Sequence, residues 1–295
     1  MVKCNLIIPG FGKSGTASLH SYLALHPDIC MSEPKEPFFF AATAAWQQGA
    51  KWYDSIFQDH GRPRRWYGES STIYSMWEPA LERIKVCLGD PKLIVLLRHP
   101  VQRLLSHYRW YWAYNWESRP LLRALQEEKE HGFNPDEPLC EIGIEHYPWV
   151  NPHAAYRRGS HYSHFCPVME RLFGKENILY LDTEQLAREP QDTMNRCFRF
   201  LEIVEYNVPA PLRANATDEV RLPRTLGLQL LLKPFPKRLR DRLDPGGRLR
   251  CRVHRMLGQK KRKPPKVTEG DKEYLTRLLA DDIAFYESMF GKVSR

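Results

Sequence analysis

Short apolar runs alternate with amphipathic stretches along most of this chain. Runs typical of strands fall at Leu6–Ile8, Ile29–Met31, Arg65–Glu69, Lys92–Leu97 and Asn177–Leu181. The Lys92–Leu97 run has no polar alternation, as expected for a strand that is buried on both faces of a parallel sheet. Stretches with helical apolar spacing lie between these runs, in the order typical of α/β proteins. The pattern predicts an α/β fold for residues 1–295: a single domain with a central parallel β-sheet flanked by helices.

Apolar side chains at helical spacing predict where the main helices lie. Leu19, Tyr22 and Leu23 form the stripe of a first helix, with Thr16 as its N-cap and its end near His26. A long helix is predicted after Pro100, where aromatic residues are unusually frequent. Further helices are predicted at 52–57, 80–88, 162–173, 182–186, 190–201 and 274–290.

Three glycines follow the first strand, at the point where the first helix is predicted to begin. Gly10, Gly12 and Gly15 allow the backbone to turn tightly, and Lys13 adds a mobile cation. A strand, a glycine loop and a helix start point backbone N–H groups and the positive end of the helix at an anion. A tight turn with a solvated lysine is the alternative. The Lys13–Thr16 sequence directly before an amphipathic helix favours a phosphate site.

The spacing of these residues narrows the kind of phosphate site. The loop of nucleotide triphosphatases is G-x-x-x-x-G-K-[ST], and its first glycine would fall on Ile7, inside the strand. That loop also works with a strand that ends in an aspartate to help hold magnesium, whereas the 92–97 strand is followed by Arg98. A cation in that position suits a second phosphate that is bound without metal. ATP chemistry, as in a P-loop kinase, is therefore kept only as an alternative.

Three motifs together resemble the sulfotransferase family, whose members use 3′-phosphoadenosine 5′-phosphosulfate (PAPS). Gly12–Thr16 resembles the loop that binds the 5′-phosphosulfate. Leu96–Tyr108 resembles the 3′-phosphate motif, with Arg98 and Ser106 eight residues apart. Lys35–Phe39 resembles a segment of the heparan-sulfate (carbohydrate) branch. The resemblance implies a P-loop-like sulfotransferase fold, PAPS as co-substrate, adenosine 3′,5′-bisphosphate as product, and no metal.

The resemblance also implies roles for individual residues. Glu36 takes the place of the catalytic base, and Lys13 that of a catalytic cation beside the phosphosulfate. Arg98 and Ser106 take the places that bind the 3′-phosphate. Ser70 departs from the family pattern, which often has a lysine there. The remaining candidates around the co-substrate are Gly12, Ser14, Gly15, Thr16 and Ala17, and those around the acceptor are Lys35, Ser71, Tyr74 and Trp110.

Several of these candidates also have an ordinary structural interpretation. Glu36 next to Lys35 is explained as a solvated loop pair, although the apolar block at 38–40 favours burial of its neighbours. A small residue that lets helices approach each other is the alternative for Ser106, against which its spacing from Arg98 speaks, and Ser71 is explained equally well as a loop hydroxyl. Core packing accounts for most of the aromatic residues after Pro100 and leaves some rings for an acceptor.

Two later segments are predicted to be irregular. Residues 131–152 are rich in glycine and proline and are interpreted as an acceptor-side lid. Residues 207–270 are basic and proline-bearing, and a solvated basic face is the simplest account of them. Within them, the 258–265 segment resembles the loop that closes over the adenosine and the 3′-phosphate. Lys261 replaces a glycine of that loop, and of the two candidate contacts, Lys261 and Arg262, the second is favoured.

The net charge of the chain indicates which classes of ligand it binds. The 44 Lys and Arg residues exceed the 35 Asp and Glu residues by 9, which indicates anionic ligands, acidic polymers or a membrane surface. A non-catalytic polyanion-binding module is therefore the second alternative. Nucleic acid is not expected, and peripheral membrane contact stays open. The acceptor of a sulfotransferase reaction is expected to be a saccharide, a glycolipid or another alcohol, with an amine left open.

The seven cysteines bear on the compartment. They are scattered and odd in number, without the spacing of metal ligands, so reduced thiols are expected. No signal peptide and no apolar run of membrane-spanning length is recognised in the sequence, and the first residues look like a natural start. The expectation is a cytoplasmic protein of bacterial type, with a trimmed Golgi luminal domain as the less favoured alternative.

Overall fold

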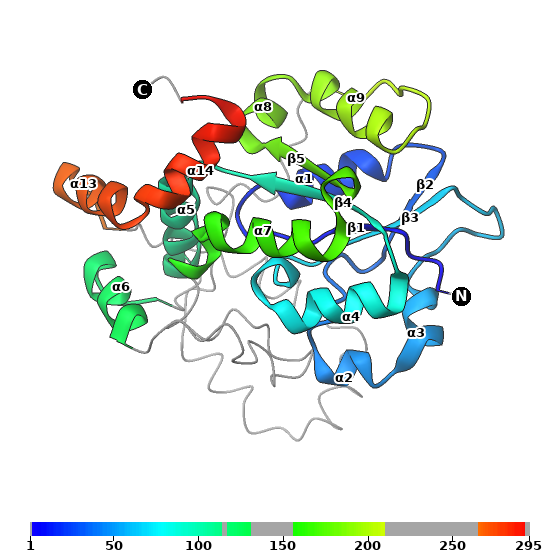
Figure 1. Ribbon diagram of the computed structural model, residues 1–295, viewed down its shortest axis with the longest axis horizontal. Coiled ribbons are helices and arrows are strands. Elements are labelled where there is room, and N and C mark those ends of the chain that lie inside the picture. The colour runs from blue at the N-terminus through cyan, green and yellow to red at the C-terminus, as the bar shows by residue number, and fades with distance from the viewer. Residues whose placement is uncertain (1, 114–116, 131–155, 210–264, 293–295) are drawn as a thin grey trace, which may run out of the picture. The chain divides into compact units, whose positions relative to one another are not determined.

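The computed structural model describes residues 2–113, 117–130, 156–209 and 265–292 (Figure 1). The chain divides into two compact units. The first comprises Met1–Tyr108, Arg119–Ala214 and Val267–Arg295, and it contains the whole sheet. The second comprises Arg109–Ser118 and Asn215–Lys266. Most of the second unit lies outside the described residues, so the fold below is that of the first unit.

Five parallel strands form one sheet in the order β2-β3-β1-β4-β5. The strands are β1 (Leu6–Ile8), β2 (Ile29–Met31), β3 (Trp66–Ser70), β4 (Lys92–Leu97) and β5 (Ile178–Asp182). The predicted bounds are confirmed for β1, β2 and β4, while β3 and β5 lie one residue later than predicted. From β1 the chain first builds the β2–β3 side and then the β4–β5 side. The carboxyl end of β1 is therefore the position at which open α/β sheets bind ligands.

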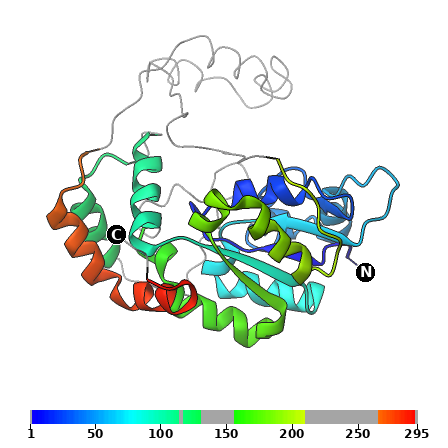
Figure 2. The ribbon, with the colours of Figure 1, turned by 90° about the horizontal axis from the view of Figure 1, so that it is seen from above.

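Helices cover both faces of this sheet, and each face has its own apolar cluster (Figure 2). The alternating side chains of β4 serve both clusters: Leu93 and Val95 point to one face, and Ile94 and Leu96 to the other. This is why the β4 run is apolar without alternation. One face is covered by α3 (Gly49–Ser55), α4 (Glu78–Leu88), α7 (Tyr162–Phe173) and α14 (Ala280–Phe290), and the other by α1 (Thr16–Leu23), α8 (Thr183–Arg188) and α9 (Pro190–Phe200).

The remaining helices lie at the margins of the sheet or connect the elements above. The α-helices are α2 (Thr43–Trp46), α5 (Pro100–Ala113), α6 (Leu121–Glu130) and α13 (Glu269–Leu278), and the 3-10 helices are η1 (Tyr74–Met76), η3 (Arg158–Ser160) and η4 (Lys175–Asn177). In the ranges that the structure describes, no helix combines the length and the apolarity needed to cross a membrane. The thiols of Cys4, Cys30, Cys87, Cys166 and Cys197 are free.

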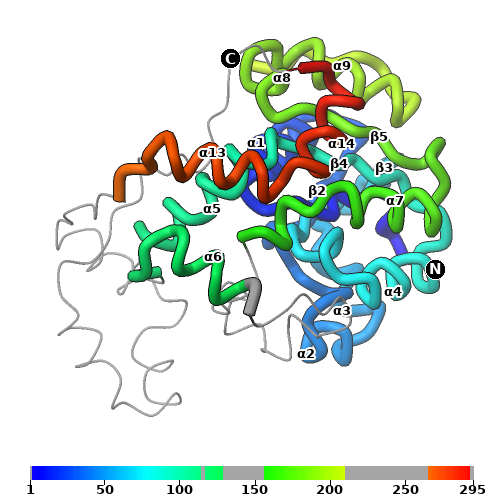
Figure 3. The backbone as a smooth tube through the Cα atoms, turned by 60° about the vertical axis from the view of Figure 1, so that its left-hand side comes forward, coloured from blue at the N-terminus to red at the C-terminus, as the bar shows by residue number. Residues whose placement is uncertain are grey.

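The chain ends in two helices, α13 and α14, and the predicted single helix over 274–290 is wrong in this respect (Figure 3). The helical path breaks at Leu279, whose ψ is 22° and whose side chain is buried. Asp282 in the first turn of α14 accepts hydrogen bonds from the backbone N–H and hydroxyl of Ser163, at 3.0 and 2.7 Å. Tyr286 donates to Asp182 at 2.7 Å. These contacts hold α14 against the start of α7 and the end of β5. The break at Leu279 therefore occurs although the apolar spacing of residues 274–290 favours one continuous helix.

Candidate active site

The glycine loop leaves the carboxyl end of β1 in a left-handed path. Lys13 has a φ of 71° and Gly15 a φ of 87°, and Gly15 is the N-cap of α1. The predicted N-cap, Thr16, is instead the first helical residue, and no side chain caps this end. Gly10 has a φ of 144°, and a Cβ there would lie 2.4 Å from Ser75 Oγ. In the first turn of α1 the Ser18 N–H donates to the Gly15 carbonyl at 3.0 Å, whereas the N–H groups of Thr16 and Ala17 have no acceptor within the helix and can bind an anion.

Ser14 lies inside this loop with a fully buried side chain. Its hydroxyl has no hydrogen-bond partner among the residues that the structure describes. The hydroxyl of Tyr162 lies beside it but donates to the backbone carbonyl of Arg98 at 2.9 Å. A buried hydroxyl without a partner is unusual in proteins, and it marks a place where a bound oxyanion could supply the acceptor.

Arg103 of α5 supports the loop from within the protein. Its side chain is 1% exposed. Nε donates to Ser160 Oγ at 2.7 Å, Nη1 donates to the Gly12 carbonyl at 3.4 Å, and Nη2 donates to the Tyr156 carbonyl. One guanidinium therefore joins the glycine loop, α5 and η3. Arg103 lies in the 96–108 motif, but its contacts with the loop could not be predicted from the sequence.

Positive charges converge on the loop. The pKa of Lys13 is lowered to about 8, chiefly because its ammonium is desolvated and because Arg98 and Arg103 repel it, while Glu36 acts in the opposite sense. Arg98, at the carboxyl end of β4, donates from Nε to Gln102 at 3.4 Å. Lys13 and Arg98 were predicted from two separate motifs, and in the structure their positive charges repel each other. A bound dianion would relieve their mutual repulsion.

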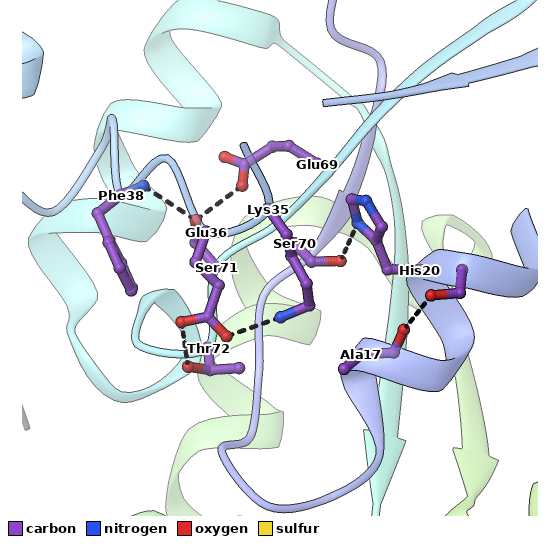
Figure 4. Close-up of polar contacts among 10 residues, drawn as sticks. Ala17, His20, Lys35, Glu36, Phe38, Glu69, Ser70, Ser71 and Thr72 are labelled. Atoms are coloured by element: carbon purple, nitrogen blue, oxygen red, sulfur yellow. Dashed lines mark hydrogen bonds and ion pairs between the residues drawn. The ribbon is translucent and has the colours of Figure 1, made fainter. Parts of the chain in front are cut away.

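Glu36 lies in the segment that follows β2, with a φ of 60° (Figure 4). Its Oε1 is 2.7 Å from Lys35 Nζ, and its Oε2 accepts a hydrogen bond from Thr72 at 3.4 Å. The Glu36 side chain is 14% exposed and that of Lys35 is 25% exposed, so the pair is half-buried rather than fully solvated. The charge of Glu36 also acts to raise the pKa of Lys13 in the glycine loop.

Ser71 and Tyr74 lie behind the Glu36 segment and are both fully buried. Ser71 Oγ accepts from the Phe38 N–H at 3.1 Å and donates to Glu69 at 2.8 Å, and the Tyr74 hydroxyl accepts from the Phe40 N–H at 3.3 Å. Both hydroxyls are thus engaged inside the protein. Contact between these two residues and an acceptor stays a prediction.

The comparisons with known proteins decide the family. The sequence profile of the sulfotransferase domain matches residues 3–213 of this chain. The chain belongs to the sulfotransferase family. The resemblance inferred from the three motifs is therefore confirmed at the level of the family, and the match includes both Lys13 and Arg98.

Curated relatives of this sulfotransferase include a heparan sulfate glucosamine 3-O-sulfotransferase 6 from Homo sapiens, 28% identical over 90% of this chain and 65% of that protein. The membrane-associated sulfotransferase kil1 from Dictyostelium discoideum is 32% identical over 48% of this chain and 29% of that protein. The chain thus spans less than two thirds of the length of these relatives. A solved sulfotransferase from Alicyclobacillus acidocaldarius has a TM-score of 0.58 and 25% identity over 74% of this chain and 88% of that one. The predicted α/β sulfotransferase fold is confirmed by this likeness.

The residues present fit PAPS, the sulfuryl donor expected of this sulfotransferase. The loop amides, the partnerless Ser14 hydroxyl and Lys13 suit the phosphosulfate end. Arg98 comes from a separate motif, but its charge acts on Lys13 and lowers the pKa of that lysine. Ser106 is half-buried in α5, two turns after the start of that helix. Gly12 and Thr16 are buried in the loop and the first turn, and Ala17 is half-buried there.

Three predicted contacts cannot be placed at this site. Trp110 belongs to the part of α5 in the second compact unit, where its ring lies 5.7 Å from that of Tyr111. Lys261 and Arg262 fall outside the described residues, as do the proposed lid at 131–152 and most of the 207–270 segment. The roles assigned to these residues stay predictions.

Proposed function

We propose that this sulfotransferase transfers the sulfuryl group of PAPS to a hydroxyl of an acceptor by in-line displacement. The observation that carries the proposal is that the charges of Lys13, Arg98 and Glu36, which follow the carboxyl ends of β1, β4 and β2, act on one another. Two cations suit the two phosphorylated ends of the donor, and a carboxylate lies beside them. The β4 strand leads into a cation instead of a magnesium-binding carboxylate, which speaks against a P-loop kinase.

In the proposed reaction Glu36 removes the proton of the acceptor hydroxyl as its oxygen attacks sulfur. The new O–S bond forms while the bond between sulfur and the 5′-phosphate oxygen breaks. The electron pair of that bond stays on the leaving adenosine 3′,5′-bisphosphate. Lys13 and the amides from Gly12 to Thr16 are the groups that would stabilise the charge developing on its 5′-phosphate, except for the Ser14 amide, which donates to the Phe11 carbonyl at 3.2 Å.

The 3′-phosphate is assigned to Arg98 and Ser106. Arg98 presents a planar guanidinium, which binds phosphate in a bidentate manner. Lys261 or Arg262 would complete this end. We further propose residues 1–295 as a single sulfotransferase domain with residues 131–152 as an acceptor-side lid, on the sequence arguments given above.

A saccharide is the acceptor class that we favour. It is supported by the similarity to proteins named for sulfation of heparan sulfate glucosamine, and by the Lys35–Phe39 segment. A glycolipid, another alcohol or an amine would use the same carboxylate. Incubation with ³⁵S-labelled PAPS and separate polysaccharide, glycolipid and small-alcohol fractions of the host distinguishes these acceptors.

The decisive variant is Glu36→Gln, which removes the base without changing the shape of the side chain. Turnover is expected to fall by about a hundred- to ten-thousandfold, the usual contribution of a general base. Binding of adenosine 3′,5′-bisphosphate, measured by calorimetry, is expected to persist. Glu33→Gln is the matched control, since Glu33 lies three residues earlier in the same segment and is exposed. Full turnover by Glu36→Gln would remove Glu36 from the mechanism, and protection from heat by ATP with magnesium alone would favour a kinase.

A further inference from the structure

The Glu36 segment contains two residues in left-handed backbone conformations on either side of Pro37. Glu36 has a φ of 60° and Phe38 a φ of 52°. Residues other than glycine adopt this region at a cost of about 1–2 kcal/mol each. Such a turn persists only where its surroundings hold it in place. The shape of this turn decides where the Glu36 carboxylate points.

Two hydrogen bonds from the turn hold it to the end of β3. The Glu36 N–H donates to the Ser70 carbonyl at 2.9 Å, and the Phe38 N–H donates to Ser71 Oγ at 3.1 Å. The first of these is a backbone contact that any side chain at position 70 would allow. The second depends on the side chain of Ser71, so it is the contact that a substitution can remove.

The orientation of the Ser71 hydroxyl is set by Glu69 (Figure 4). Ser71 Oγ donates its only proton to Glu69 Oε2 at 2.8 Å, which leaves its lone pairs for the Phe38 N–H. Glu69 Oε1 accepts a second hydrogen bond, from Tyr53 at 3.2 Å. A relay therefore runs from a buried carboxylate through one hydroxyl to the amide two residues after Glu36.

Glu69 is an unexpected residue at its position. It is fully buried in β3, in register with Ile7, on the face of the sheet that carries the larger apolar cluster. Burial raises its pKa to about 7, and the hydroxyls of Ser71, Tyr74 and Tyr53 limit the rise. Burial of a carboxylate opposes folding unless its hydrogen bonds are satisfied. No atom of Glu69 takes part in the sulfuryl transfer proposed above.

We propose that Glu69 is a positioning residue for Glu36, which it holds in place through the hydrogen bond from Ser71. Thr72, the next residue along, donates directly to Glu36 Oε2. The Glu69–Ser71 relay thus holds the backbone of the turn at Phe38, and Thr72 contacts the Glu36 carboxylate itself. The inference rests on the proposed role of Glu36 as the base.

Ser71→Ala tests the relay, because it removes the acceptor of the Phe38 N–H and the donor to Glu69 together. Thr193→Val is the matched control: Thr193 is also fully buried, and its hydroxyl donates to the Glu189 carbonyl at 2.9 Å in α9, on the other face of the sheet. We expect Ser71→Ala to lower kcat roughly ten- to hundredfold, with KM for PAPS within about twofold, because a misplaced base weakens only the transition state. We expect Thr193→Val to keep both constants.

Hydrogen exchange of the 35–39 peptide gives a readout that does not depend on catalysis. Exchange is expected to rise in Ser71→Ala and to stay unchanged in Thr193→Val. Unchanged exchange in Ser71→Ala would overturn the relay. Faster exchange with full kcat would overturn the link between the relay and Glu36.

Two further variants separate the possible failures. Ser71→Thr keeps a hydroxyl and is expected to recover most of kcat. Glu69→Gln keeps the volume of the side chain but has one acceptor oxygen in place of the two that now serve Ser71 and Tyr53, so an intermediate loss of kcat is expected. This variant tests the proposal if Ser71→Ala does not fold. Full kcat in Glu69→Gln would overturn the proposal. Full turnover by Glu36→Gln would contradict the proposed role of Glu36 as the base. The exchange experiment would still decide whether the Glu69–Ser71 relay holds the turn.

Discussion

Lys35 Nζ lies 2.7 Å from Oε1 of Glu36, so two consecutive residues form an ion pair directly after β2. Successive side chains of an extended segment point in opposite directions. The left-handed turn at Glu36 brings the two together, and it leaves Oε2 to Thr72. Both carboxylate oxygens of Glu36 thus have a partner, and in the reaction proposed above an acceptor hydroxyl would share one of them with Lys35 or Thr72.

Lys35→Met is expected to reduce kcat/KM for the acceptor while leaving the fold almost unchanged. A half-exposed ion pair contributes only about 0.2–1 kcal/mol to the free energy of unfolding, so the thermal midpoint should hardly move. The affinity for adenosine 3′,5′-bisphosphate should also stay the same. Lys51→Met in α3 is the control, because Lys51 is exposed. An unchanged kcat/KM in Lys35→Met would show that Lys35 has no part in acceptor binding.

Arg98→Ala and Lys13→Ala are expected to affect opposite ends of the nucleotide. Loss of charged hydrogen bonds to a phosphate should weaken binding by about ten- to hundredfold in each case. Arg98→Ala should weaken adenosine 3′,5′-bisphosphate but not adenosine 5′-monophosphate, whereas Lys13→Ala should weaken both. Calorimetric titration with the two nucleotides measures the difference. Equal losses for both nucleotides in Arg98→Ala would contradict its assignment to the 3′-phosphate, and Arg188→Ala serves as an exposed control.

The affinity for adenosine 3′,5′-bisphosphate is expected to fall as the pH rises above about 8. Lys13 is charged below its pKa of about 8 and neutral above it, since burial and the charges of Arg98 and Arg103 lower that pKa and Glu36 opposes them only in part. An anion binds the charged form, so the association constant should decline by up to about tenfold per pH unit above 8. Lys13→Arg should remove this decline, because arginine stays charged. A pH-independent affinity between 7 and 9.5 in the parent protein would contradict the assignment.

The strands and the glycine loop could be predicted from the sequence because local signals decide them. The uninterrupted apolar run at Lys92–Leu97 is typical of a strand that is buried on both faces of a sheet. The three glycines after β1 favour a tight turn. Lys13 and Arg98 could be paired in advance because parallel strands carry their carboxyl ends to the same edge.

The parts that the sequence did not reveal depend on contacts between distant residues. Arg103 gains its role from Ser160, 57 positions away, and Glu69 from Tyr53, 16 positions away. Ser71 was predicted near the acceptor from its place in the family motif, and the hydrogen bond from its hydroxyl to Glu69 could not be foreseen from that motif. The break at Leu279 likewise follows from where Asp282 docks and not from the local pattern.

Gly159→Ala is expected to destabilise the protein and to disturb the glycine loop through Arg103. A Cβ at position 159 would lie 2.4 Å from Arg103 Nη1, which has little room because that side chain is buried and hydrogen-bonded. Overpacking of this kind typically lowers the free energy of unfolding by about 1–3 kcal/mol. Gly270→Ala is the control, since its Cβ would meet nothing closer than 3.8 Å and alanine favours the α13 helix. Equal thermal midpoints for the two variants would contradict the close packing of Arg103.

Glu69→Gln is expected to change how stability depends on pH. The carboxyl pKa rises from 4.5 in the unfolded chain to about 7 in the folded protein, so the folded state holds the proton more tightly. Glu69 therefore opposes folding increasingly as the pH rises from about 4.5 to about 7, by up to about 3 kcal/mol at the plateau above. The other titratable groups facing Glu69 are Glu36, Cys4, Tyr53 and Tyr74.

Glutamine has no proton to lose, so the Glu69→Gln variant should lack this decline. Burial raises the pKa of Cys4, Tyr53 and Tyr74 well above neutral pH, so these groups do not add a slope in the same interval. The measurement is the free energy of unfolding by urea at several pH values from 4.5 to 8 for both proteins. The difference between variant and parent should move in favour of the variant as the pH rises across this interval, whatever its sign at pH 4.5. A constant difference would mean that the pKa of Glu69 is the same in the folded and the unfolded chain, and that its hydrogen bonds to Ser71 and Tyr53 fully offset its burial.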